Sequence, residues 1–380
     1  MTTLRGPRRE VGVSPERCSN GGLATLTRTR VTALVVTAAV LLGIAGVSAV
    51  RAGAPSALPP LPPQELLASS VQAMAAPFSV SGDVTSRIET GLPDLPGTLG
   101  GTGTGLGGVA TALLGTQHFK VWRSPEGARV ARVSDLSEQV LVANRDEAWF
   151  WDSNGMTAVR LDLAALASGR GADPAWAGVT APTRADLTGW IGSALAALEP
   201  YAQVSVAGTV EVAGRPAYDL VLTPAAGPTL IGQVAVAIDA QTRLPLRFSV
   251  TPKGTGDPAV EIGFDAVSFD PIDPAMFAFD PPEGARVSEA TPPAAKLHPE
   301  WMPDERLESP APGDVRTFGT GFSARVAIRL SGPLPEEARA LLPYAGPLFS
   351  ALVVERGGDT WLLLGPVPTT TLSRDADRLP

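Results

Sequence analysis

The side chains that most often perform catalysis or bind metals are scarce in this sequence. It contains two histidines, His118 and His298, and one cysteine, Cys18. A zinc site brings three or four His, Cys or carboxylate ligands to one point, and these residues are too few and too scattered for that. No HExxH, GxSxG, CxxC or phosphate-binding loop pattern occurs. The sequence therefore predicts no metal, no cofactor and no catalytic residue.

Carboxylates are the remaining side chains that could act as catalytic acids or bases. Asp146, Glu147 and Asp152 lie close together in the sequence, and a pair of carboxylates is what a glycosidase uses. Asp146 and Glu147, however, fall in a predicted hairpin turn that begins at Asn144, where charged residues are common because turns lie at the surface. We therefore expect a protein that is not an enzyme.

The candidate functional residues are apolar instead. Side chains two positions apart on a strand point to the same face of its sheet, and several predicted strands carry apolar residues at this spacing. An acyl chain on such a surface would gain about 0.8 kcal/mol per buried methylene. Taken singly, each residue is better explained as an ordinary core residue. Taken as a set, they line a concave face that two short helices cannot fill, and such leftover apolar volume binds a hydrophobic ligand. The predicted lipid-binding residues are Phe78, Val80, Trp149, Trp151, Val234, Val236, Leu246, Phe248 and Phe264.

Two predicted helices and eleven predicted strands position these residues. Apolar residues recur at helical spacing over 64–74 and 187–198. Strands joined by tight turns pair antiparallel, and so wide a sheet curls. The predicted fold is mainly β (α+β), an unclosed antiparallel β-barrel (a half-barrel) covered by short helices. The expected strands are 78–90, 117–123, 128–133, 139–143, 148–152, 157–161, 203–212, 216–223, 232–238, 244–251 and 259–269.

The first part of the chain is predicted to direct export. An uncharged apolar run occupies 31–50, long enough to cross a bilayer as a helix. The positive-inside rule places the arginine-rich head, 1–30, in the cytoplasm, and 51–61 is a Pro-rich tether. Small residues near the end of the run resemble signal-peptidase sites. Two alternatives stay open: a single-pass anchor in the cell membrane with an extracytoplasmic domain, or a cleaved signal peptide that releases the protein into the cell envelope.

The charge of the chain argues against some partners. The net charge is −8, and the head carries six arginines and two glutamates, or +4, which leaves −12 on residues 31–380. Binding to nucleic acid or to anionic lipid headgroups needs clustered Lys and Arg, so we expect neither. Cys18 precedes the apolar run, and the exported part therefore has no disulfide and no lipid-bearing cysteine.

Several segments together resemble the LolA-like family, which includes the outer membrane lipoprotein carrier protein LolA and the RseB-like proteins. The order of the segments carries the resemblance, which covers 62–287. The segment SRIETGLPDLPG and a C-terminal extension are similar to the membrane-tethered form in high-GC Gram-positive bacteria. The segments are PPQELLASSVQAM, FSVSGDV, EAWFWDSNGMTAVRL, GRPAYDLVLTP, AIDAQTRLPLRFSV and IGFDAVSFDPIDPAMFAFDPPEGARV.

The resemblance implies an unclosed β-barrel whose hydrophobic interior accepts acyl chains of lipids or lipoproteins. It implies an extracytoplasmic carrier or chaperone that binds by hydrophobic burial, without catalysis. Because RseB-like proteins have a related domain, a sensing or regulatory module that binds a membrane protein partner stays open as the alternative.

The chain is expected to divide into one large and one small folded part. The half-barrel domain is predicted over 62–288 and a Pro-rich linker over 289–314. Residues 315–380 are predicted to form a small C-terminal α+β region. Its expected elements are strands 323–330, 348–356 and 360–367 and a helix over 336–342.

Overall fold

The computed structural model describes residues 58–89, 91, 115–134, 137–163, 200–290, 314–330, 332, 334 and 339–380. The predicted cytoplasmic head, the apolar run 31–50, residues 51–57 of the tether, the helix over 187–198 and residues 291–313 of the linker lie outside these residues. Among the helices of the described part, none combines the length and the apolar character needed to span a membrane.

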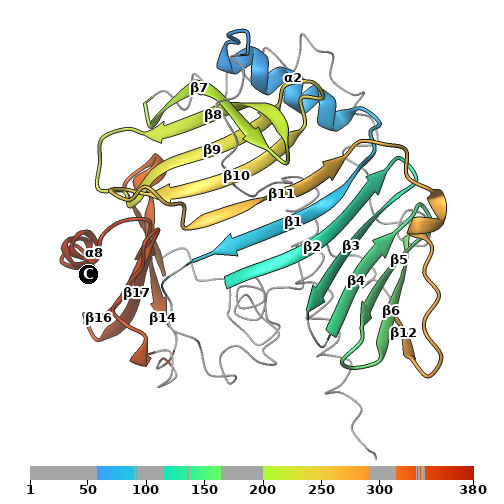
Figure 1. The fold of residues 1–380 in the computed structure, drawn as a ribbon. Helices are drawn as coiled ribbons and strands as arrows, with labels where there is room; N and C mark the ends of the chain where they lie inside the picture. Colours follow the sequence, from blue (N-terminus) through green and yellow to red (C-terminus); the bar gives the residue numbers. More distant parts are fainter. Residues whose placement is uncertain are drawn as a thin grey trace, which may run out of the picture.

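Twelve strands form one large, curved sheet (Figure 1). Its spatial order is β12-β6-β5-β4-β3-β2-β1-β11-β10-β9-β8-β7, and the edge strands β12 and β7 do not pair with each other. The predicted unclosed barrel is therefore confirmed. The strands are β1 (Val80–Ile88), β2 (Gly115–Ser124), β3 (Gly127–Ser134), β4 (Ser137–Ala143), β5 (Glu147–Asp152), β6 (Thr157–Asp162), β7 (Ala202–Val212), β8 (Arg215–Pro224), β9 (Ile231–Asp239), β10 (Pro245–Pro252), β11 (Val260–Ser268) and β12 (Arg286–Ala290).

Edge strand β12 adds a feature that the sequence did not predict. It pairs parallel with β6, whereas the other neighbouring strands of this sheet pair antiparallel. The chain leaves β11 near the middle of the sheet and travels to the far edge before it enters β12. Such a long connection permits parallel pairing, which a tight turn does not.

The connecting segment, residues 269–285, packs across one face of β3–β6. It contains the 3-10 helix η1 (Pro274–Phe277), which Asp273 begins by accepting a hydrogen bond from the Ala275 backbone N–H at 2.9 Å. The Phe277 side chain is buried in one cluster with Trp149, Trp151 and their neighbours. Figure 1 shows this segment running down the outer side of the sheet toward β12.

Helix α2 (Pro63–Ala75) corresponds to the first predicted helix. Proline at the first helical position needs no hydrogen-bond partner for its nitrogen and has a helical φ already, so the Pro-rich tether ends where the helix begins. Leu66 is fully buried against Tyr218, Leu220 and Ile238. The helix is therefore attached to β8 and β9 by its apolar side.

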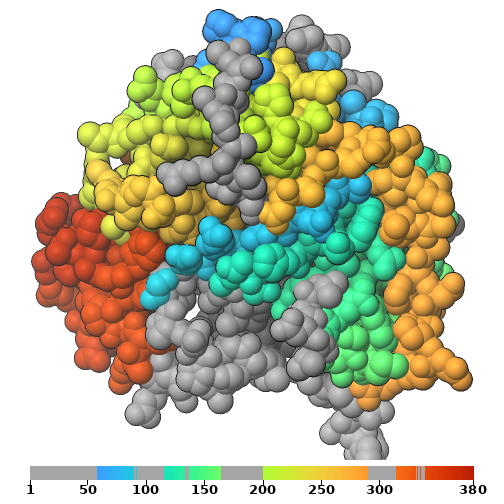
Figure 2. Space-filling model, in the orientation of Figure 1, coloured from blue at the N-terminus to red at the C-terminus, as the bar shows by residue number. Residues whose placement is uncertain are grey.

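A second, five-stranded sheet forms the C-terminal lobe, in the order β13-β14-β17-β16-β15. Helix α8 (Thr369–Ala376), which the sequence analysis did not predict, packs on one face of it. The Leu230 backbone N–H donates to the Pro366 carbonyl at 2.8 Å and joins the lobe to the loop between β8 and β9, where the two parts adjoin in Figure 2. The remaining elements are β13 (Val315–Phe318), η2 (Gly321–Ser323), β14 (Arg325–Leu330), β15 (Tyr344–Ala345), β16 (Ser350–Arg356) and β17 (Asp359–Gly365).

Candidate ligand-binding face

One face of the large sheet is a continuous apolar surface over strands β7–β11 and the end of β1, and we call this whole face of the sheet the apolar face. The strand register places side chains of the same face directly opposite each other. Two rows of aliphatic and aromatic side chains cross the sheet in this way. The first is Val206, Leu220, Val236, Phe248 and Ile262, and the second is Val204, Leu222, Val234, Val250, Val260 and Ile88.

The opposite face of the same strands is polar. Its rows carry charged residues of these strands. One row pairs Asp219 with Ala237 and Arg247, and the next runs from the buried Val221 and Ala235 through Ser249 to Glu261 and Arg87. A sheet with one polar and one apolar face turns the polar one to water and buries the other. The apolar face is therefore the interior of the half-barrel.

The apolar face is only partly covered by the described residues. Helix α2 packs on its β7–β9 part through Leu66 and Leu67. The side chains of Val234, Val236 and Phe248 nevertheless keep part of their surface exposed. With about 4.8 Å between neighbouring strands, the six strands that carry the second row span about 24 Å. This is an apolar surface wide enough for a long hydrocarbon chain.

The structure brings some of the predicted lipid-binding residues together and separates others. The pairing of Val84 with Phe264 and of Phe248 with Val236 puts five of them on the apolar face. Phe78 precedes β1 and packs at that end, with the Arg123 guanidinium 4.0 Å from its ring centroid. The five are Val80, Val234, Val236, Phe248 and Phe264. Val80 and Phe264 are buried in the core, so the three that keep exposed surface are Val234, Val236 and Phe248.

Leu246 lies at a break in the pairing of β10 with β9, where one strand has an extra residue. Its side chain is fully buried in the core with Val212 and Ala237. It therefore supports the sheet and exposes no surface to a ligand.

Trp149 and Trp151 lie on the other face from the residues above. Leu141 and Phe150 share the apolar face with Val84, because the register runs without a break from β1 to β5. The two tryptophans alternate with Phe150 along β5, so their side chains point away from the apolar face. They pack against the connecting segment, with the Trp149 and Phe279 ring centroids 5.6 Å apart. The expectation that they share the interior with the other residues is therefore corrected.

Polar groups lie on the apolar face from β1 to β5. Ser86 of β1 pairs with Ile262 of the first row, and Gln117 of β2 pairs with Ser86. Arg132 pairs with Gln139, and Gln139 pairs with Asp152, whose side chain is buried. Burial lowers the pKa of Arg132, while the charge of Asp152 acts in the opposite direction. The interior thus has an apolar half on β7–β11 and a strip of polar side chains that crosses β1–β5.

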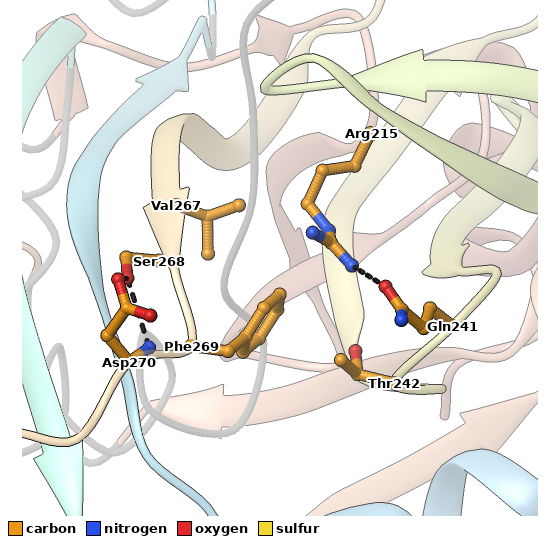
Figure 3. A pocket seen from close by; sticks show the side chains of 7 residues that line it. All are labelled: Arg215, Gln241, Thr242, Val267, Ser268, Phe269 and Asp270. Carbon is orange, nitrogen blue, oxygen red and sulfur yellow. Dashed lines mark hydrogen bonds between the residues drawn. The ribbon is translucent and has the colours of Figure 1, made fainter.

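A pocket of about 520 Å³ opens at the end of the sheet where β11 ends. In Figure 3 the Arg215 side chain points across it toward Gln241, and the Phe269 ring lies beside the guanidinium, 4.8 Å from centroid to Cζ. Asp270 contributes a carboxylate to the lining, and the Arg215 guanidinium is paired with Asp239. Its balanced charge and open, polar lining make this pocket a poor fit for a hydrocarbon chain.

Asp239 holds the turn beside this pocket. It is 0% exposed and accepts hydrogen bonds from Arg215 Nε at 2.7 Å and from the Thr242 N–H at 2.6 Å. Burial by itself would raise the pKa of Asp239, but the hydrogen bonds from Arg215 and Thr242 outweigh it, so the pKa lies below its ordinary value. The carboxylate therefore has a structural role, which its sequence position in a turn did not reveal.

Other residues of the apolar rows were not predicted from the sequence. Leu220, Leu222 and Val250 belong to the rows as fully as the residues predicted for β9 and β10. Their period of two was visible in the sequence. What was lacking was the register, which shows that separate strands present these side chains to one surface.

No protein-family model matches the chain, and neither does any curated protein. Among solved structures it is similar to the MucA/MucB complex of Pseudomonas aeruginosa, with 18% identity over 82% of this chain and 96% of that chain and a TM-score of 0.42. It is also similar to the Mycobacterium tuberculosis lipoprotein LppX, with 13% identity over 56% of this chain and 97% of that chain and a TM-score of 0.27.

A LolA superfamily protein from Nitrosomonas europaea is a third similar structure, with 10% identity over 58% of this chain and 99% of that chain and a TM-score of 0.22. Because all three TM-scores lie below 0.5 and all three identities below 25%, these likenesses establish neither ligand nor function. The topology of its own twelve-stranded sheet gives the chain the open half-barrel fold that its resemblance to LolA-like carriers implies.

Proposed function

We propose that the protein binds the acyl chains of lipids or lipoproteins on the apolar face of its half-barrel and acts as a carrier or chaperone in the cell envelope. The observation that supports this most strongly is the pair of apolar rows across β7–β11, which are continuous, free of charge and incompletely covered by the described residues. The predicted export of the chain is consistent with such a ligand.

The chemistry of the face fits a hydrocarbon chain. Val236 and Phe248 are direct neighbours in the first row and Val234 and Val250 in the second, and their backbone N–H and C=O groups are engaged within the sheet. The surface thus offers methyl, methylene and ring groups only. Binding would come from apolar burial, at about 0.8 kcal/mol per methylene. Ten buried methylenes would supply about 8 kcal/mol before the costs of association, which suits reversible transfer.

Lipid extraction followed by mass spectrometry tests this proposal. The full chain is purified from its own membranes, washed with a lipid-free buffer and extracted, and a membrane protein without a lipid cavity serves as the control. We expect an acyl-bearing lipid at about one molecule per protein. Lipid no richer than in the control would contradict the proposal. Capture of a protein partner without lipid would favour the regulatory alternative that the sequence left open.

A further inference from the structure

The five-stranded sheet of the C-terminal lobe also has an apolar face without a described covering element, which we call the lobe face. Neighbours across the strands are Val315, Ile328, Leu362 and Val353 in one row, and Val326, Leu364 and Ala351 in the next. All seven side chains are partly exposed. The hydrophobic cluster of the lobe lies on the other side of the sheet.

Helix α8 covers that other side. Ala327, Trp361 and Leu363 alternate with the residues of the lobe face and are buried with Leu372 and Ala376 of the helix. The Arg325 guanidinium on the same side pairs with Asp375 of α8. In Figure 1 the helix lies on the far side of the lobe from the half-barrel. The lobe face is therefore turned toward the half-barrel.

The lobe stands at the end of the half-barrel where the second apolar row lies. Ile88 and Val260 of that row are the last residue of β1 and the first of β11. Just beyond them, a Cβ added to Gly91 would come within 3.3 Å of Pro347 in the lobe. The hydrogen bond from Leu230 to Pro366 attaches the loop before β9 to the end of β17. The apolar row thus leads directly to the lobe.

The chemistry of the lobe face favours a hydrocarbon chain over a peptide as its ligand. Its rows are aliphatic from β13 to β16, and the second row ends at the buried Tyr344 of β15. Among its described residues only Glu355, next to the β16–β17 turn, is charged. Strands β14, β17 and β16 each have a partner on both sides, so their backbone groups are already hydrogen-bonded. A peptide would bring N–H and C=O groups that need partners here and find none. A hydrocarbon chain brings no such groups.

From these observations we infer that the lobe face is a second wall of the acyl-binding site, so that a long acyl chain lying on β7–β11 continues onto β14, β16 and β17. This inference rests on the proposed function and deepens it. It selects long-chain lipids over short ones, because each methylene that reaches apolar surface improves the affinity about fourfold. It also gives the C-terminal extension a task in ligand binding.

Photo-crosslinking in the full chain tests the inference. Palmitic acid with a diazirine at its terminal carbon is supplied to membranes that contain the protein, and labelled peptides are mapped by mass spectrometry after illumination. A second probe carries the diazirine at mid-chain. We expect labels on β9 and β10 and also on β14, β16 or β17. Labels on the half-barrel alone would overturn the inference and leave the proposed function standing, whereas the absence of labels, or labels on the lobe alone, would overturn both.

Leu362→Gln supplies a second, independent measurement. Leu362 lies at the centre of the lobe face, and Arg316→Gln on the other side of the same sheet is the matched control. We expect Leu362→Gln to weaken palmitate binding about tenfold and to leave octanoate binding within about twofold, because the shorter chain does not span both walls. The control should change neither affinity. An equal loss for both fatty acids, or no loss for palmitate, would contradict the inference.

Discussion

Replacement of Phe248 by aspartate is expected to weaken fatty-acid binding by about a hundredfold or more. Phe248 lies at the centre of the first apolar row, with Val236 on one side and Ile262 on the other. A carboxylate at this position would have to lose its hydration when an acyl chain covers it, at a cost of several kcal/mol. A loss of about 3 kcal/mol corresponds to a factor of more than 100 in Kd. Titration with a fluorescent fatty acid measures the change.

Two control variants separate binding from folding in this experiment. Thr251→Asp introduces the same charge on the same strand, but on the polar face opposite Gln233, and should bind normally. Trp149→Leu removes an aromatic side chain from the face packed by the connecting segment. It should lower the free energy of unfolding by about 1–3 kcal/mol and retain binding. Unchanged binding in Phe248→Asp, or equal losses in Phe248→Asp and Thr251→Asp, would show that the ligand lies elsewhere.

Asp239→Asn is expected to lower the free energy of unfolding by about 3 kcal/mol, because removing one partner of a buried ion pair leaves the other uncompensated. The variant weakens both bonds to Arg215 and those to the Thr242 backbone and hydroxyl. Arg215 keeps some exposure, which limits the loss. Asp377→Asn removes an exposed pair with Arg356 and should have little effect. Urea unfolding measures both, and similar losses in the two variants would contradict this account.

The same carboxylate gives stability a predictable pH dependence. The pKa of Asp239 in the folded chain is below its ordinary value, so the unfolded chain binds this proton more readily. Its stabilising contribution is therefore fully present above the ordinary aspartate pKa of about 3.9 and is lost as the pH falls through the lower, folded value. Asp239→Asn should flatten the stability curve in this acid range.

The half-barrel could be predicted from the sequence because the pattern that identifies each strand lies within a few consecutive residues. Alternation of apolar and polar residues and a turn at each end are enough to find β1 through β11 one by one. The face of the sheet on which Trp149 lies cannot be found from such a local pattern. It depends on counting residues through four successive strand pairs from β1 to β5, and an error of one residue reverses the answer. That is why the tryptophans were assigned to the interior, and why only the strand register shows that Val236 and Phe248 share one face.

Elements that depend on distant packing were missed for a related reason. Helix α8 begins with three threonines, which favour strands over helices, and its stability comes from burying Leu372 and Ala376 on the lobe. Strand β12 exists because the connecting segment carries it to the edge beside β6. The lobe face could be recognised only after the register of β14, β17 and β16 was known.

The central claim is that an acyl chain lies on the apolar face of β7–β11. A crystal structure of the protein with a fatty acid brominated in mid-chain tests it most directly, since the anomalous signal of bromine locates the chain without interpretation of weak density. We predict that the bromine lies over Val236 and Phe248, on the side of the sheet away from Arg247 and Glu261. Bromine on the polar face, in the Arg215 pocket or beneath the connecting segment would contradict the claim.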